Sequence, residues 1–255
     1  MANNNAKVFA FYSYKGGTGR TTASANVAAM LALEGCRVLC LDLDLEGPGI
    51  AIVFRMAEAQ PFPLHSYFEG KHKLLKRDFI HYDRIQFPEK SGLWVLPASN
   101  RLAGIDTTPG GRLLGQLKRL IDLAEQEIKA NIVIIDTPSG FGDLSALSMY
   151  VSNCVVALFR YSRQHLLGTA KVYDFVKKSH LPFLAVASCV PPTDYKGEKG
   201  KYDEMLKTFY DGPLIEIKED NSLKWQERIV VGTNARRCAA VAGYRQVANE
   251  LIKLL

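Results

Sequence analysis

Residues 9–22 read FAFYSYKGGTGRTT, and the interpretation of the whole chain starts from them. An apolar, aromatic-rich run with the character of a β-strand ends at Tyr14. Three glycines follow within four positions, and an Ala-rich segment with helical spacing comes directly after them. The pattern therefore predicts a strand, a glycine loop and a helix. Such a loop turns successive backbone N–H groups towards one point, and the helix adds the positive end of its dipole, so the expected ligand is a polyphosphate.

The stretch departs at two positions from the usual phosphate-loop pattern, G-x-x-x-x-G-K-[ST]. Tyr14 stands where the first glycine would be, and Arg20 stands where the lysine would be. Written as K-G-G-x-G-[KR]-T-T, with an additional cation at Lys15, the stretch resembles the deviant Walker A loop of the ParA/MinD family. Members of that family are ATPases that position plasmids, chromosomes, division sites and other cargo. The resemblance covers nearly the whole chain.

This resemblance implies a role for each residue of the loop. In the family the early lysine crosses a dimer interface to the partner's nucleotide, which implies that role for Lys15, and the hydroxyl of Thr21 would bind Mg²⁺. The residues expected to line the phosphates of ATP are Gly16, Gly17, Thr18, Gly19, Arg20 and Thr22. We expect Lys15 and Arg20 to act in catalysis as well as in binding, with ATP and Mg²⁺ as the cofactors.

The composition is that of a protein with a full apolar core. Of its 255 residues, 47% are apolar, and its five cysteines are too few and too irregularly spaced for a disulfide framework, which favours a reducing compartment. The start MANNNA leads straight into the first predicted strand and resembles no signal peptide. No apolar run approaches the roughly 20 residues of a membrane-spanning helix. We therefore expect a cytoplasmic protein.

The formal net charge of +6 favours acidic partners such as nucleic acid or anionic lipid. Basic clusters lie at residues 71–77, 196–201 and 236–237. They lack the interleaved aromatic residues of a single-strand binder, so solvated faces are the simpler interpretation, and non-specific DNA binding is left open. Lipid-binding members of the family carry an amphipathic helix beyond the fold, whereas the last apolar stripe here belongs to the expected closing helix. We expect no direct membrane binding.

The second predicted strand, residues 36–44, ends in two alternating acids, Asp42 and Asp44. Ligands of open α/β sheets bind at the carboxyl ends of such strands. A D-x-D pair in isolation would be interpreted as a helix cap or a pair of loop acids. Placed one β-α-β unit after a phosphate loop, it matches switch I of the family. There the acid at the position of Asp44 orients the attacking water, and Asp42 would support the metal shell.

Residues 131–136, NIVIID, have the form of a Walker B strand. Four aliphatic residues lead to Asp136, whose carboxylate would bind Mg²⁺ through water. The following TPSGFG has the form of a switch II that senses the γ-phosphate. A buried strand that ends in Asp is common, but its place about 120 residues after the phosphate loop supports the family resemblance.

The rest of the chain alternates between strands and helices. The predicted strands are 93–97, 154–159, 182–188 and 213–217, and the predicted helices are 111–129, 163–178 and 238–255. Residues 55–90 predict only one or two short surface helices, with three exposed or capping His, and residues 193–212 predict a charged excursion. Without an internal repeat or a linker, residues 1–255 are expected to form one α/β domain. Its doubly wound, mostly parallel sheet would carry helices on both faces, as in P-loop NTPases.

Recognition of the base departs from the family pattern. There an Asn just after the later strand often reads the adenine, whereas residues 188–192 here read SCVPP. Backbone or other groups must then contact the base, and Pro191 is the residue of this segment that we expect to do so. The choice between ATP and GTP is left open for the same reason.

The function implied by the resemblance is slow, Mg²⁺-dependent hydrolysis of ATP by a chain that dimerises on ATP. Such a dimer would act as a positioning, partition or regulatory switch read by a protein partner or adaptor. Related iron–sulfur reductases need Cys shortly after the Walker B region, which Cys154 and Cys189 fit poorly. Bacterial tyrosine kinases of similar fold carry a C-terminal Tyr cluster, but Tyr244 is the only Tyr after residue 210. A nucleotide-sensing module with little or no hydrolysis stays open, because Arg and Lys are not interchangeable at a tight phosphate site.

Overall fold

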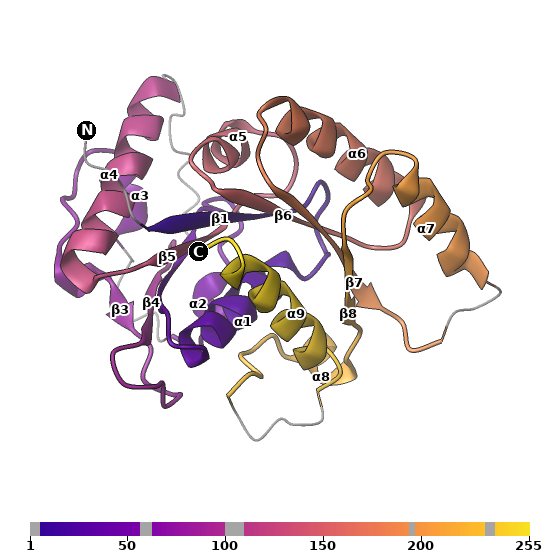
Figure 1. Cartoon of the computed structure of the whole chain (residues 1–255). Coiled ribbons are helices and arrows are strands. Elements are labelled where there is room, and N and C mark those ends of the chain that lie inside the picture. Colours follow the sequence, from indigo (N-terminus) through magenta and orange to yellow (C-terminus); the bar gives the residue numbers. More distant parts are fainter. Residues whose placement is uncertain (1–5, 57–62, 100–109, 194–196, 233–237) are drawn as a thin grey trace.

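The computed structural model describes residues 6–56, 63–99, 110–193, 197–232 and 238–255 (Figure 1). In this part of the chain, eight strands form one sheet in the order β3-β4-β2-β5-β1-β6-β7-β8. Neighbouring strands pair in parallel, except that β3 is antiparallel to β4 at one edge. The strands are β1 (Lys7–Tyr12), β2 (Arg37–Asp42), β3 (Ile80–His81), β4 (Gly92–Leu96), β5 (Ile132–Asp136), β6 (Cys154–Phe159), β7 (Phe183–Val190) and β8 (Leu214–Lys218). This confirms the doubly wound, mostly parallel sheet.

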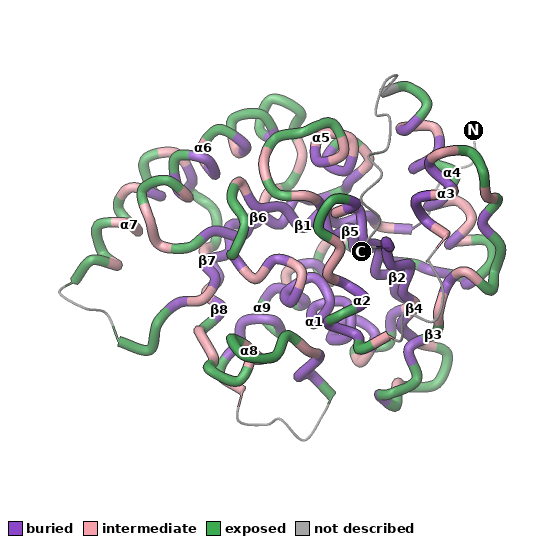
Figure 2. Tube along the Cα trace, turned by 180° about the vertical axis from the view of Figure 1, so that it is seen from behind, coloured by how far each residue is buried: buried purple, intermediate pink, exposed green. Residues whose placement is uncertain are grey.

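Helices cover both faces of the sheet (Figure 1). On one face lie α1 (Arg20–Leu33), α2 (Ile50–Val53), α8 (Asn221–Trp225) and α9 (Val241–Ile252). On the other lie α3 (Leu64–Phe68), α4 (Gly110–Ile128), α5 (Asp143–Tyr150), α6 (Arg163–Lys178) and α7 (Glu198–Lys207). A 3-10 turn, η1 (Lys76–Asp78), precedes β3. Figure 2 shows the result, with buried residues in the strands and exposed residues on the outer helices.

Helix α1 is buried along nearly its whole length because it lies between the sheet and α9. Its run of alanines has side chains small enough for close packing on both sides. The helix therefore has almost no solvent-exposed face, and its position relative to the strands is fixed by contacts all around it. This holds the loop at its N-terminus in place.

The strand order brings the carboxyl ends of β2, β5 and β1 side by side. Their register aligns Asp42 of β2 with Asp136 of β5, and Asp136 with Phe11 of β1. The glycine loop after β1, the acidic segment after β2 and the segment after β5 therefore meet at one edge of the sheet. This is where the sequence places the three nucleotide motifs.

Residues 55–90 and 193–212 differ from the prediction, and the first of these stretches contains the short strand β3 as well as helix α3. Helix α3 is buried instead of lying on the surface, because its apolar side chains pack under α4. His65 of that helix is 4% exposed, and its Nε2 lies 3.1 Å from the carbonyl oxygen of Leu45. The predicted excursion at residues 193–212 contains α7. Short pieces with mixed charge carry little periodicity, so neither feature could be read from the sequence.

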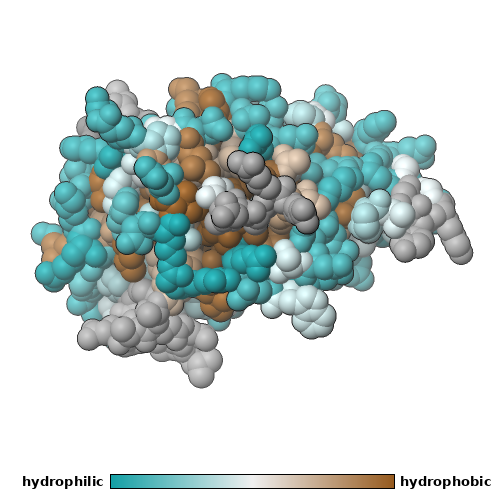
Figure 3. Space-filling model, turned by 90° about the horizontal axis from the view of Figure 1, so that it is seen from below, coloured by the Kyte–Doolittle hydropathy of each residue, from teal (hydrophilic) through white to brown (hydrophobic). Residues whose placement is uncertain are grey.

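Two compositional expectations can be compared with the structure. All five cysteines are free, as expected for a chain without a disulfide framework. Among the described residues, no helix has the length and apolar character needed to cross a bilayer. The face in Figure 3 carries hydrophilic side chains over much of its surface, with apolar side chains visible between them.

Candidate nucleotide-binding site

The loop between β1 and α1 has the backbone of an anion-binding loop. Gly17 and Gly19 have φ values of 75° and 70°, in the left-handed region that favours glycine. Gly19 is also the N-cap of α1, and no side chain of the described residues caps this helix. The first N–H groups of α1 can therefore donate to an anion, aided by the positive end of the helix dipole.

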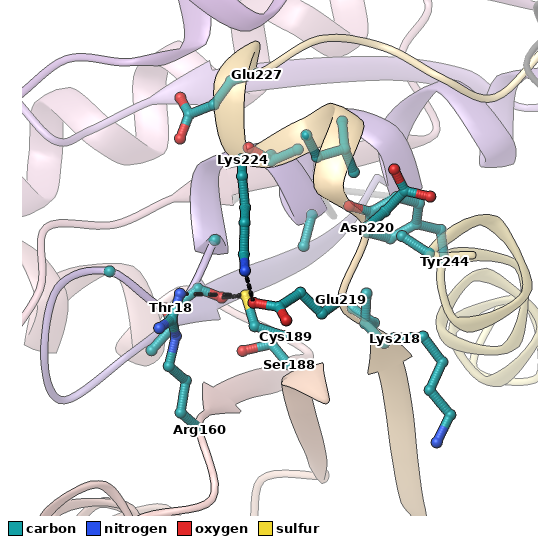
Figure 4. Close-up of a pocket in the computed structure, with 17 residues that line it drawn as sticks. Thr18, Arg160, Ser188, Cys189, Lys218, Glu219, Asp220, Lys224, Glu227 and Tyr244 are labelled. Carbon is teal, nitrogen blue, oxygen red and sulfur yellow. Dashed lines mark hydrogen bonds and ion pairs between the residues drawn. The ribbon is translucent and has the colours of Figure 1, made fainter. Parts of the chain in front are cut away.

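A cavity of about 260 Å³ lies beside this loop (Figure 4). Its volume is close to the lower end of ligand pockets, roughly 300–1,000 Å³. Gly17, Thr18 and Gly19 form part of its wall. Arg160 after β6, the carboxyl ends of β7 and β8, and the segment after β8 form most of the remainder. The hydroxyl of Thr18 is buried without a hydrogen-bond partner among the described residues. A ligand in the cavity can supply that partner.

The wall of the cavity also carries polar groups that are available to a base. Glu219 forms an ion pair with Lys224 at 2.9 Å, and Nη2 of Arg160 donates to Sγ of Cys189 at 3.4 Å (Figure 4). Pro191 does not line this cavity but a neighbouring one of about 310 Å³. Its contact with a base stays a prediction.

Arg20 is directed at the acidic strand ends, and it does not line the cavity. Its Nε donates to Oδ1 of Asp136 at 2.9 Å, and its Nη2 donates to Oδ2 of Asp44 at 2.8 Å. Its Nη1 donates to Oγ of Ser13 at 3.2 Å. Burial by itself would lower the pKa of Arg20, but the two carboxylates outweigh it and the pKa is raised. The guanidinium therefore stays charged and neutralises Asp136, which is completely buried.

Asp42 and Asp44 have different environments. Both carboxylate oxygens of the buried Asp42 accept backbone N–H groups, from Asp44 and from Ile50, each at 3.1 Å. Burial, with the nearby Asp136, raises the pKa of Asp42. Oδ1 of Asp44 accepts the N–H of Gly47 at 3.1 Å. Asp42 therefore shapes the turn that presents Asp44, and its contact with a metal ion stays a prediction.

The residues at this edge fit a divalent cation. Oδ2 of Asp136 is buried and has no hydrogen-bond partner among the described residues. Burial raises the pKa of Asp136, while Arg20 and the hydroxyl of Thr21 act in the opposite direction. No three His, Cys, Asp or Glu side chains gather as a metal site within the described ranges, so Thr21, Asp136 and a phosphate would have to hold Mg²⁺ together. Such oxygen ligands are the ones Mg²⁺ prefers.

Two further contacts connect the segments of the site. The N–H of Gly140, in the predicted switch II, donates to the carbonyl oxygen of Ser13 at 3.1 Å. Lys15 is exposed, and its Nζ donates to Oε1 of Gln164 at 2.7 Å. The expected lysine thus lies at the surface beside α6, and its role across a dimer interface stays a prediction.

Comparison with known proteins identifies the family. A family model described as an AAA domain matches residues 6–183. The sporulation initiation inhibitor protein Soj of Bacillus subtilis is 29% identical over 174 residues, which are 67% of this chain and 65% of Soj. The chain belongs to the ParA/MinD family of P-loop ATPases.

Two more relatives of this ParA/MinD chain extend the similarity. An uncharacterised ATP-binding protein of Methanocaldococcus jannaschii is 26% identical over 212 residues, covering 83% of this chain and 74% of its own length. The septum site-determining protein MinD of Pyrococcus horikoshii, solved in complex with Mg-ADP, has the same fold with a TM-score of 0.73. The two are 22% identical and cover 98% and 97% of their chains.

Sequence reasoning missed part of the site. The motifs identified the glycine loop, Asp44 and Asp136, because each lies at or just beyond the carboxyl end of a strand. Cys189 lies in the segment 188–192 that the sequence assigns to the base, but the motifs gave no sign of Arg160 or of the Glu219–Lys224 pair, which also line the cavity. These residues have no fixed spacing from the loop, so only the sheet order brings them together.

Proposed function

We propose that this chain is an Mg²⁺-dependent ATPase whose ATP-bound form is a dimer that acts as a positioning, partition or regulatory switch. The observation that carries the proposal is the meeting of the glycine loop, Asp44 and Asp136 at one sheet edge, beside a cavity. The ATPase class follows from the family. Slow turnover, dimerisation and a protein partner or adaptor that reads the dimer belong to the proposal.

Each residue has a chemical task in this proposal. The N–H groups of the loop and of the first turn of α1 hold the phosphates, and Asp44 orients a water for attack on the γ-phosphate. Mg²⁺, held by Thr21 and Asp136, would neutralise charge on the phosphates. Phosphoryl transfer needs positioning and charge neutralisation more than a dedicated base, so these few side chains suffice.

The cavity beside the phosphate loop offers polar groups to a purine base. Adenine and guanine both present a hydrogen-bond donor next to an acceptor on one edge, and the Glu219–Lys224 pair offers an acceptor beside a donor, 2.9 Å apart. Ion pairs this exposed contribute little to folding by themselves, so a ligand can share them at little cost. Competition of GTP and ATP for the purified chain tests the preference. Glu219→Gln should weaken nucleotide binding, because it removes the charge that holds Lys224 in place.

Hydrolysis and binding should separate in two variants. A water-orienting carboxylate acts in the transition state, so Asp44→Ala should slow phosphate release about a hundredfold or more while ATP still binds. Asp136→Ala should lose Mg²⁺-dependent binding, because a metal ligand serves the ground state as well. The exposed Asp83 gives a matched control, and Asp83→Ala should behave as the parent does. If Asp44→Ala turns over like the parent, Asp44 is not the water-positioning group.

A specific contact favours the second candidate function, a nucleotide-sensing module with little or no hydrolysis. Arg20 engages Asp44 directly, and an Asp44 held in this way does not orient water. In that case the parent would bind ATP but release phosphate no faster than Asp44→Ala. Single-turnover measurements with purified protein distinguish the two functions.

A further inference from the structure

Arg20 makes contacts that the phosphate-loop pattern does not require. Its side chain is 7% exposed and bonds two carboxylates and one hydroxyl, with all three donor nitrogens engaged. One of those carboxylates, Asp136, is the metal ligand of the proposed function, and the other, Asp44, is the water-orienting group. Through Ser13 the same guanidinium touches the residue that accepts the N–H of Gly140 in switch II. Arg20 thus joins all three motifs.

The guanidinium of Arg20 binds the same two carboxylates that a divalent cation would bind. The fork of Arg20 has Oδ1 of Asp136 and Oδ2 of Asp44 as partners, which leaves Oδ2 of Asp136 beside a positive charge. A cation brought to that oxygen meets repulsion from the guanidinium in a buried setting, where charges are poorly screened. Mg²⁺ also demands near-ideal octahedral geometry, so it cannot adjust to a ligand that is held in another direction.

An arginine side chain can bind either carboxylates or phosphates, so it can exchange one for the other. Its planar fork matches carboxylates and phosphates equally well, whereas a lysine ammonium is a single compact charge that cannot bond Asp136, Asp44 and Ser13 in the same fixed arrangement. Arg20 is the first residue of α1 and directly follows Gly19 of the phosphate loop. A polyphosphate on that loop therefore offers the guanidinium a second set of acceptors.

We propose that Arg20 is the resident countercharge of Asp44 and Asp136 and competes with divalent cations for them, so that the cation binds tightly only together with nucleotide phosphates. This inference rests on the proposed function, because it takes the same site to bind Mg-nucleotide. It explains why an Arg at this position is compatible with the family's metal site. It also makes Arg20 a positioning residue, which acts through the carboxylates that it holds.

Titration with Mn²⁺ in the absence of nucleotide tests the competition, with free Mn²⁺ measured by electron paramagnetic resonance. Arg20→Gln should bind Mn²⁺ at least about tenfold more tightly than the parent, and Arg20→Lys should lie between them. Adding Asp136→Asn to Arg20→Gln should abolish the gain. Arg163→Gln is the matched control, since it removes one positive charge at an exposed position of α6 and should leave the Mn²⁺ affinity unchanged.

The outcomes separate this inference from the proposed function. Equal Mn²⁺ affinity of the parent and of folded Arg20→Gln overturns the inference. If thermal melts show that Arg20→Gln does not fold, the Arg20→Lys variant is used instead, because it keeps the positive charge beside the buried carboxylate. Mn²⁺ affinity equal to that of the parent in Arg20→Lys then overturns the inference. Phosphate release plays no part in these titrations. A chain that gains Mn²⁺ affinity as expected but hydrolyses no ATP contradicts the proposed ATPase and leaves the competition standing.

Discussion

Gly49 is a residue whose missing side chain matters for the metal site. A Cβ added at this position would lie 2.9 Å from Cγ2 of Thr21, so the turn after Asp44 packs directly on the residue proposed to bind Mg²⁺. At Gly47 in the same turn, a Cβ would meet Oδ1 of Asp44 at 3.6 Å, an ordinary contact. Gly49 therefore leaves room for Thr21 that a larger residue would take, whereas Gly47 leaves no such necessary space.

Substitutions at these two glycines give a matched pair. Gly49→Ala should push Thr21 away and weaken the binding of Mg-ADP roughly tenfold, about 1.4 kcal/mol. Gly47→Ala should change the affinity much less. Calorimetric titration of both variants, with and without Mg²⁺, measures the difference. Equal losses in the two variants, or a loss for Gly49→Ala that persists without Mg²⁺, would contradict a role through Thr21.

Asp220, in the segment after β8, should make the stability of the fold depend on pH. Its carboxylate accepts the N–H of Ser222 at 2.9 Å, the hydroxyl of Ser222 at 2.6 Å and the N–H of Ala239 at 2.8 Å. These bonds, the Ser222 hydroxyl above all, lower the pKa of Asp220 from its usual 3.8 to about 2. A carboxyl with a lowered pKa stabilises the fold above its unfolded pKa, and that stabilisation is lost as the pH falls through about 2.

The variant Asp220→Ala tests this. The gap in melting temperature between parent and variant should be full above pH 4.5 and should close as the pH falls from 4 towards 2. Asp211→Ala, at an exposed position before β8, provides the control and should show no such closing gap. A gap that is constant from pH 6 to pH 2 would mean that the charge of Asp220 contributes nothing.

At the scale of elements, α9 depends on a glycine for its packing against β8. A Cβ at Gly243 would lie 2.6 Å from the carbonyl oxygen of Glu216 and 2.8 Å from Cα of Ile217, both rigid backbone atoms. The helix can accept a methyl group there only by moving off the sheet. Because α9 in turn covers α1, such a movement would loosen the helix that carries the phosphate loop.

Gly243→Ala should therefore lower the free energy of unfolding by about 1–3 kcal/mol, the usual cost of overpacking. Gly115→Ala is a matched helical control, because its Cβ would meet nothing nearer than Nη2 of Arg119 at 4.0 Å. That control should gain up to about 1 kcal/mol from the higher helix propensity of Ala. Denaturant titration measures both. A stabilising Gly243→Ala would show that α9 does not need this close approach.

The elements also show what the sequence could predict. Helix α6 occupies the predicted residues 163–178, since its long periodic pattern leaves little choice. The first strand ends at Tyr12, two residues before the predicted Tyr14, where the chain turns and Ser13 contacts Arg20. Short elements such as α5 and α7 were missed because two to three turns of helix have too few residues to show a clear period.

Some features of the candidate site could likewise be predicted from the sequence, and others could not. Asp44 and Asp136 could be found because a carboxylate at the end of an apolar strand is a local pattern. The orientation of Arg20 could not be found, since it depends on β2 and β5 lying next to each other and on the burial of Asp136. A carboxylate buried in that position needs a countercharge, and the sequence alone does not say which cation supplies it.

At the scale of the whole molecule, the order β2-β5-β1 allows one side chain to connect three motifs. Lys15 belongs to the same loop but has a different environment, since it is exposed and its Nζ contacts Gln164 at the start of α6. We therefore expect the two cations of the loop to have separate tasks. Arg20 contacts the carboxylates within its own chain, and Lys15 would contact a neighbouring molecule by exchanging its exposed hydrogen bond to Gln164 for another.

That division predicts how the assembly responds to Lys15→Ala. In the Asp44→Ala background, where ATP should persist, the chain with Lys15 should double its mass by light scattering on addition of Mg-ATP. With Lys15→Ala added, it should stay a monomer that still binds ATP, because the N–H groups of the loop are intact. Lys178→Ala removes another exposed lysine, which lies in α6 and pairs with Asp174 at 2.8 Å, and should leave dimerisation unchanged. If the Lys15→Ala chain dimerises as well as its parent, Lys15 does not reach the partner's nucleotide.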